Sequence, residues 1–238
     1  TLYRHKLAMF LLSNIASAVT VDSFARKDFC DKQIIFKKSI VIRDPIDINP
    51  MNQNKFAQRQ LSSQGGILWI GNRENLHSIE PMLKVMESQR TRKFFIASNF
   101  EADDPIKDKF KEVNFLDWEI DISYDTEKID ASFMVLSHLS TRDPSSEYKS
   151  ENKMVTAIAS GLIPVVSSSP AYLELAIALD AKRLVFNSLE EVPMILNNLE
   201  DEWMKNFSIR AKAYIKDHYS HESIFQNLRA LVLENNCK

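Results

Sequence analysis

Residues 149–169 read KSENKMVTAIASGLIPVVSSS, passing from a polar loop through a helix of small residues into an apolar strand. We expect the helix over about Asn152–Ser160, because Gly161 is a typical C-terminal stop. The strand, about Leu162–Val166, is apolar throughout, as in strands that are buried on both faces. A helix that turns directly into such a strand indicates one repeat of an α/β fold.

The same alternation of strands and helices occurs on both sides of this stretch. It predicts a Rossmann-like parallel sheet flanked by helices, which is an α/β fold. Such sheets bind ligands at the carboxyl ends of their strands, so a site is expected in the loops after Ile70, Leu136 and Val166. The expected strands lie at about 18–21, 39–42, 67–70, 93–97, 114–118, 133–136 and 184–186, and the expected helices at about 7–18, 24–29, 79–88, 105–112, 189–199, 201–218 and 223–235.

A polar connector divides the chain into two parts. Its composition, rich in Asn, Gln and Ser, is typical of a linker. The predicted divisions are an N-terminal segment over 1–48, the linker over 49–64, a Rossmann-like domain over 65–220, and a C-terminal helix over 221–238 that packs toward the N-terminal part.

The composition excludes several classes of function. The 30 Lys and Arg residues are balanced by 32 Asp and Glu residues, so no overall basic field draws the chain to nucleic acid. No stretch approaches the about 20 apolar residues that span a bilayer. Cys30, Cys237 and the five histidines show no metal-ligand spacing, and Asp103-Asp104 is interpreted as a solvated loop. We expect a cytoplasmic protein; the first residues, ending in Ala16-Ser17-Ala18, mimic a signal peptide, which we interpret as chance.

Glycine is scarce, with four in 238 residues, so each glycine marks a position that needs an explanation. Gly71 and Asn72 directly follow a predicted strand, where a residue without a side chain lets backbone N–H groups approach a ligand such as phosphate. A plain turn is the alternative interpretation. The motifs GxGxxG and GxxxxGK(S/T) are absent, which disfavours dinucleotide-dependent oxidoreductases and P-loop proteins.

The helix described first begins with a second candidate for anion binding. Ser150 is a suitable N-cap and places Asn152 and Lys153 in the first turn, where free N–H groups and the helix dipole favour an anion. A lysine is unfavourable there unless a phosphate supplies the compensating charge. The alternative is a solvated lysine that pairs with Glu147 or Glu151.

A series of short motifs runs along the chain in a fixed order: Trp69-Ile70-Gly71, Phe133-Met134-Val135-Leu136-Ser137, Lys149-Ser150-Glu151-Asn152-Lys153, Ala157-x-Ala159-x-Gly161-Leu162-x-Pro164-Val165-Val166, Ser167–Ser169, Pro170-Ala171-Tyr172, Glu174-Leu175 and His218-Tyr219-Ser220. Together they resemble the donor-sugar half of glycosyltransferases with the GT-B fold, of the glycosyl transferases group 1 kind. The resemblance covers Gly65 to about Leu233. The segments Ala18–Ser23 and Val41–Asp47 are similar to the end of that fold's N-terminal, acceptor-binding domain, so the match is to the last part of a longer enzyme.

The resemblance implies a nucleotide-diphosphate sugar as donor, with UDP or GDP, and no metal or other cofactor. Gly71 and Asn72 would approach the diphosphate, and Lys153 with Asn152 would contact phosphate or ribose. The further residues implied are Asp117 and Trp118 at the base, Ser150 and Thr156 on the helix that faces the ribose, and Ser169, Pro170, Ala171 and Tyr172 beside the sugar and diphosphate. Core packing is an equal alternative for Trp118 and Tyr172.

The sequence departs from the family at its catalytic pair. Many retaining members carry two glutamates separated by seven residues, and Tyr148 and Thr156 occupy those positions here. No nucleophile is therefore assigned, and inversion and retention both stay open. Lys153 is the candidate stabiliser of the leaving diphosphate. His138 is a weak candidate for a catalytic base, because a lone histidine is more often structural.

We therefore expect a hexosyltransferase-like, metal-independent glycosyltransferase of polysaccharide biosynthesis, truncated or divided. It would transfer sugar to a glycan or a lipid-linked acceptor that is held by a missing domain or a partner chain, and contact with the inner face of the membrane stays open. Two alternatives remain. One is a sugar-nucleotide epimerase or hydrolase of the same fold, and the other is a non-catalytic binding or scaffold domain, which Thr156 and the missing N-terminal domain favour.

Overall fold

The computed structural model describes residues 19–32, 39–46, 60–89, 92–101, 103–116, 129–138 and 149–236. The helix predicted over 7–18, most of the predicted linker, and the candidate base contacts Asp117 and Trp118 lie outside these residues. In the described ranges, no helix combines the length and the apolar character that a membrane span requires.

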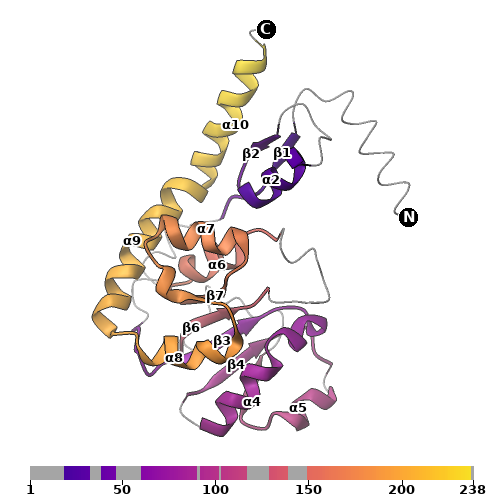
Figure 1. Cartoon of the computed structure of the whole chain (residues 1–238), viewed down its shortest axis with the longest axis vertical. Helices are drawn as coiled ribbons and strands as arrows, with labels where there is room; N and C mark the ends of the chain where they lie inside the picture. The colour runs from indigo at the N-terminus through magenta and orange to yellow at the C-terminus, as the bar shows by residue number, and fades with distance from the viewer. Residues whose placement is uncertain are drawn as a thin grey trace.

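A parallel sheet forms the centre of the molecule, and its order within the described residues is β5-β4-β3-β6-β7-β8 (Figure 1). The chain runs from β3 through β4 to β5 on one side and from β6 through β7 to β8 on the other, so the winding reverses between β3 and β6. This is the strand order of a Rossmann-like fold and confirms the predicted fold class. The strands are β3 (Gly66–Ile70), β4 (Phe94–Ala97), β5 (Val113–Leu116), β6 (Ala131–Leu136), β7 (Ile163–Ser167) and β8 (Val185–Phe186).

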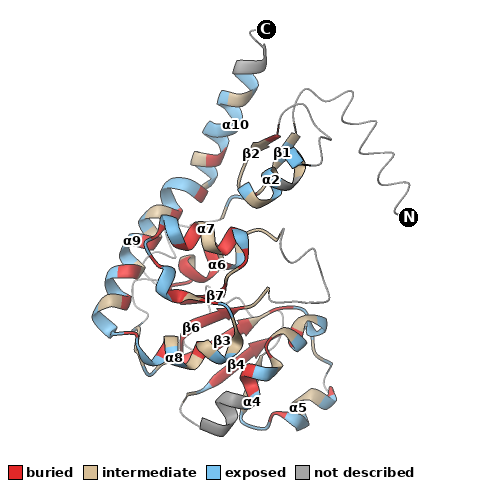
Figure 2. Ribbon diagram, viewed as in Figure 1, coloured by how far each residue is buried: buried red, intermediate tan, exposed pale blue. Residues whose placement is uncertain are grey.

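Helices cover both faces of the sheet, and Figure 1 shows α6 and α7 on one side of the strands with α4 and α5 on the other. The burial pattern explains this arrangement, since every residue of β4, β6 and β7 is buried, as expected of strands covered on both faces. Figure 2 shows the same strands in red. The helices are η1 (Arg73–Ser78), α4 (Glu80–Gln89), α5 (Pro105–Lys109), α6 (Asn152–Ala159), α7 (Pro170–Ala178), η3 (Lys182–Leu184), η4 (Leu189–Glu191), α8 (Val192–Asn197), α9 (Asp201–Tyr219) and α10 (His221–Asn236).

Helix α7 is absent from the sequence prediction, which places nothing between the strands at 162–166 and 184–186, and that omission is wrong. Its residues, PAYLELAIA, are mostly apolar, so they lack the alternation of apolar and polar faces by which an amphipathic helix is recognised. Ala171, Tyr172, Leu175 and Ala176 are buried in the fold. A helix that is apolar on several sides is typical of such a buried position.

A smaller unit precedes the sheet, formed by β1 (Val19–Val21), α2 (Phe24–Lys32), β2 (Ser39–Val41) and the residues up to Ile46; we call it the N-terminal unit. Its two strands are parallel and pair Val19 with Ser39. The unit meets the end of α9, where the Ile46 N–H donates to the Tyr219 carbonyl at 2.8 Å and Ile46 bridges to Ser220. The chain therefore passes the α9–α10 junction before it enters the sheet.

Candidate functional site

The reversal of winding between β3 and β6 marks the point where open α/β sheets bind their ligands, in the crevice outside the carboxyl ends of the strands. β3 ends at Ile70 and β6 ends at Leu136, so Gly71-Asn72 and Ser137-His138 follow adjacent strands at this edge. Helices α6 and α7 begin at the same edge of the sheet. Helix α6 follows β6 and leads to the amino end of β7, and α7 follows the carboxyl end of β7. The candidate site lies among these groups.

Lys153 connects two parts of the site. It lies in the first turn of α6, and its Nζ donates to the carbonyl oxygen of Ile70 at 3.2 Å, next to Gly71. Lys153 is solvent-exposed, and neighbouring protein atoms only partly desolvate its ammonium group. This desolvation, followed by the charge of Lys149, holds the pKa of Lys153 below its ordinary value. The charges of Lys149 and Lys153 repel one another, and a bound anion would relieve that repulsion.

Helix α6 begins at Asn152, whereas a cap at Ser150 requires a helix that begins at residue 151. Glu151 occupies the N-cap position, its carbonyl accepts from the N–H of Met154 at 2.8 Å and of Val155 at 3.1 Å, and no side chain caps the helix. The prediction that Ser150 caps α6 is therefore wrong. Between these two described residues, Lys153 and Glu151, there is no ion pair; Glu151 instead pairs with Arg43 at 3.4 Å and accepts from the Tyr219 hydroxyl at 2.8 Å.

Two other predicted contacts of α6 bind protein groups. The Asn152 amide donates to the carboxylate of Asp44 in the N-terminal unit. The Thr156 hydroxyl donates to the Asn152 carbonyl at 2.9 Å, as Ser and Thr often do inside helices. Thr156 therefore stands where the family resemblance implies a carboxylate, with its hydroxyl directed to its own helix.

Gly71 has a structural reason for lacking a side chain. A Cβ there would lie 2.6 Å from the ring atoms of Trp69, whose residue is 3% exposed. The Gly71 N–H also donates to the carbonyl of Ala97 at 3.3 Å. The exposed Asn72 follows at the start of η1 and makes no capping hydrogen bond with its side chain. Of the two predicted diphosphate contacts, Asn72 is the one with a side chain, and it is exposed.

His138 lies beneath the start of α7. Its backbone N–H donates to the Ser167 hydroxyl at 2.9 Å, and its ring stacks on Tyr172. Nδ1 lies 3.4 Å from the Ser169 hydroxyl and Nε2 lies 3.1 Å from the Tyr172 hydroxyl. Burial, and then the charges of Lys149 and Lys153, lower the pKa of His138 to about 4. The imidazole is therefore neutral at physiological pH.

The residues at the start of α7 divide into two groups. Ser169 is the N-cap and Pro170 is the first helical residue, which suits its fixed φ. Pro170 is exposed and Ser169 is buried, and both directly follow the carboxyl end of β7. Ala171 is 2% exposed and Tyr172 is fully buried in the core. Tyr172 thus packs in the core, which was one of the two interpretations of that residue.

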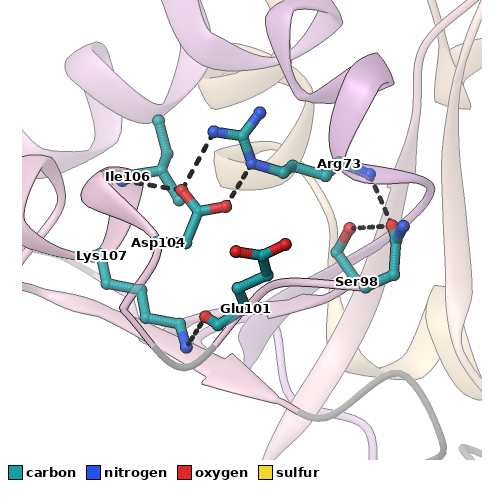
Figure 3. A network of polar contacts seen from close by, with 7 residues as sticks. Arg73, Ser98, Glu101, Asp104, Ile106 and Lys107 are labelled. Carbon is teal, nitrogen blue, oxygen red and sulfur yellow. Dashed lines mark hydrogen bonds and ion pairs between the residues drawn. The ribbon is translucent and has the colours of Figure 1, made fainter.

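A polar network joins the loops after β3 and β4 at the same edge of the sheet (Figure 3). The Arg73 guanidinium makes two hydrogen bonds to Asp104, and the Arg73 N–H donates to the Asn99 side chain at 2.9 Å. Asp104 also caps α5 by accepting from the Ile106 N–H at 3.1 Å. Asp104 is 6% exposed, so its interpretation as part of a solvated loop is wrong. The sequence gives no local sign that Asp104 pairs with Arg73, because Arg73 precedes it by 31 residues.

Arg43 and Asp44 reach α6 from the N-terminal unit and were not predicted from the sequence. Arg43 pairs with Glu151, and Asp44 accepts from Asn152. The sequence does place this charged pair directly after an apolar strand, but such pairs are common at strand ends and do not by themselves indicate a functional site. Among the described residues, no group of three or more His, Cys, Asp and Glu side chains could hold a metal ion.

Neither a family model nor a curated protein matches the chain. Solved structures do. TarM is 19% identical with a TM-score of 0.66, over 95% of this chain and 45% of that one. HepE of Anabaena, crystallised with UDP-glucose, is 17% identical with a TM-score of 0.65, over 96% of this chain and 67% of that one. The catalytic domain of starch synthase IV from Arabidopsis thaliana, bound to ADP and acarbose, is 15% identical with a TM-score of 0.57, over 90% and 55%.

These likenesses show that the chain has the GT-B glycosyltransferase fold, as its motifs predict. The chain spans about half of TarM and about two thirds of HepE.

Proposed function

We propose that this chain is the donor-binding part of a glycosyltransferase, which transfers a sugar from a nucleoside-diphosphate sugar to an acceptor. The observation that carries the proposal is the position of Lys153. Its ammonium group lies at the point where the sheet reverses its winding, 3.2 Å from the end of β3 and in the first turn of α6. A diphosphate is the group that such a combination of lysine and helix N-terminus suits best.

The chemistry assigned to this site is electrostatic. When the bond between the anomeric carbon and the diphosphate oxygen breaks, the electron pair and the negative charge go to the diphosphate. Lys153 and the N-terminal ends of α6 and α7 would stabilise that charge from fixed positions. Because positive charge is already in place, we propose that the reaction needs no metal. Full activity in excess EDTA is the expected result.

His138 fits a structural role better than a catalytic one. Its two ring nitrogens lie within 3.4 Å of the hydroxyls of Ser169 and Tyr172, and its pKa of about 4 leaves it uncharged. A general base acts best with a pKa near the working pH. We propose that His138 supports the start of α7, where Ser169 and Pro170 border the crevice.

Nucleotide binding tests the proposal directly. Thermal-shift and calorimetric titrations would compare UDP, GDP, ADP, CMP and TDP with their sugar conjugates. A ligand at ~100 times its dissociation constant adds about 2.7 kcal/mol, which raises the melting temperature by about 2–4 °C per kcal/mol in a chain of this size. We expect a shift with UDP and its sugars, since HepE was crystallised with UDP-glucose.

A matched pair of lysine variants locates the site. Lys153→Ala should weaken nucleotide binding by far more than it lowers the melting temperature of the free protein. Lys205→Ala, at an exposed position on α9, should leave both unchanged. Equal loss of binding and of folding in Lys153→Ala would remove Lys153 from the site, and the absence of any shift with every nucleotide would refute the proposal.

A second candidate is a domain that binds a nucleotide-sugar without transferring it, and Thr156 favours it. The position lacks the carboxylate found in many relatives, and its hydroxyl is directed to Asn152. Product analysis separates the candidates. Transfer to an acceptor supports the transferase, a free or epimerised sugar supports a hydrolase or epimerase, and tight binding without turnover supports the binding domain.

The acceptor half would come from a preceding domain or a partner chain, because this chain spans only part of its structural neighbours. We propose a glycan or lipid-linked acceptor in polysaccharide biosynthesis. WaaG, another neighbour, is described as a glycosyltransferase of lipopolysaccharide biosynthesis. A cytoplasmic location, with contact at the inner face of the membrane, is proposed with it, and fractionation of cells expressing the longest natural chain would test it.

A further inference from the structure

Arg43 lies at the contact between the N-terminal unit and the sheet. Its guanidinium carbon is 5.6 Å from the centroid of the Phe24 ring and 5.1 Å from that of Tyr219, so it makes cation–π contacts with two aromatic residues. Its side chain is 20% exposed. The guanidinium forms ion pairs with Glu151 at 3.4 Å and with Glu174 at 3.5 Å.

The two carboxylates belong to the two helices whose N-terminal ends border the crevice. Glu151 occupies the N-cap position of α6, and Glu174 lies in α7. The residues that follow Arg43 and Glu151 in the chain are also in contact, because Asp44 accepts a hydrogen bond from Asn152. Residues 43 and 44 of the N-terminal unit therefore hold residues 151 and 152, directly before Lys153.

Glu151 is a carboxylate in an uncommon position. Its side chain is 6% exposed, and one oxygen accepts from the Tyr219 hydroxyl at 2.8 Å. Among the described residues, its other oxygen, Oε2, and the Nε of Arg43 have no hydrogen-bond partner. A buried carboxylate that is only partly satisfied is unfavourable for stability, and such groups call for a reason other than packing. Its charge is compensated by Arg43 and by the N-terminal end of α6.

We propose that Arg43 is a positioning residue of the donor site, which acts through Glu151 to fix the first turn of α6 and so the place of Lys153. This inference rests on the proposed function. If Arg43 places Lys153 in this way, docking of the N-terminal unit strengthens the binding of a nucleoside diphosphate. By reciprocity, the diphosphate also strengthens the docking of the N-terminal unit.

The first experiment needs no ligand. Hydrogen exchange of the backbone amides at residues 152–156 would be compared in the wild type and in Arg43→Gln. Loss of the ion pair should raise exchange there by about tenfold or more, since local opening is governed by the contacts that hold the turn. The matched control is Arg183→Gln, which also removes an arginine from an aromatic ring, that of Trp203. Unchanged exchange at 152–156 in Arg43→Gln would overturn the proposal.

The second experiment measures UDP affinity at a temperature where each variant is folded. Arg43→Gln and Glu151→Gln should each weaken UDP binding by about tenfold, within the usual range of coupling between two sites. The double variant should be no weaker than the single ones, because both act through one contact. Arg43→Lys should restore part of the affinity, and Arg183→Gln should retain all of it. Equal affinity of Arg43→Gln and the wild type would overturn the proposal.

The two experiments separate this inference from the proposed function. If the wild type binds no UDP or other nucleotide, the proposed function fails, and the exchange data still decide whether Arg43 fixes the first turn of α6. If Arg43→Gln does not fold, Glu151→Gln replaces it in both experiments. Glu151→Gln keeps the size of the side chain and the contact with the Tyr219 hydroxyl.

Discussion

The imidazole of His138 lies flat against the ring of Tyr172, with ring centroids 4.4 Å apart and planes inclined by 16°. This places a titratable ring inside the wall of the candidate site. Burial is the largest cause of its lowered pKa, about 4, against an ordinary value of 6.5. Between these two values the folded chain binds fewer protons than the unfolded chain. Stability therefore rises with pH through that window and is lost on acidification.

We expect His138→Gln to lose less stability than the wild type when the pH falls from 7 to 5. Gln cannot take up a proton, so this part of the acid destabilisation disappears. Urea midpoints at the two pH values measure the effect. His221→Gln, at an exposed position in α10, is the control and should behave as the wild type. Identical falls in the wild type and His138→Gln would contradict the prediction.

Glu174 should show the opposite dependence on pH. Burial, and then the charge of Glu151, raise its pKa, so the folded chain retains a proton that the unfolded chain releases. Stability from this group is present below pH 4.5 and is lost as the pH rises through the raised pKa. Glu174→Gln should therefore gain stability relative to the wild type at pH 7 but not at pH 4. A gain of equal size at both pH values would show that the charge of Glu174 is not its cause.

Gly71→Ala should destabilise the fold by about 1–3 kcal/mol, because the new methyl group has no space. Its Cβ would lie 2.6 Å from two ring atoms of a buried Trp69. Denaturant unfolding measures the loss. In the Trp69→Phe background, which removes those ring atoms, the same substitution should cost less. Full additivity of the two changes would show that the clash with Trp69 does not explain the glycine.

Asp104→Ala should be more damaging than Arg73→Ala. Asp104 both caps α5, a role worth about 1 kcal/mol, and pairs with the half-exposed Arg73. The hydrogen bond from Arg73 lowers the pKa of Asp104, so this stabilisation is present above the unfolded pKa of 3.8 and is lost as the pH falls through the folded pKa. Asp104→Asn, which keeps an acceptor for the Ile106 N–H, should lie between the two. Melting temperatures at pH 7 check the order.

The fold could be predicted from local sequence, while much of the site could not. The α6–β7 unit is recognisable because Gly161 and the apolar strand after it follow each other directly, and φ at Gly161 is 75°, which favours glycine. Helix α7 is missed because its mostly apolar sequence gives no helical period. The contact of Asn152 with Asp44 joins residues 108 positions apart, and no local pattern contains such a pair.

The hydrogen bond between Ile46 and Tyr219 has a consequence for how proteins of this fold can be recombined. Ile46 precedes the sheet domain in the chain and Ser220 follows its last helix, α9, and these two residues are bridged. Domains whose ends lie close together are readily inserted or exchanged. Residues 47–219 can thus be treated as a cassette. A cassette from another GT-B protein should fit between the N-terminal unit and α10.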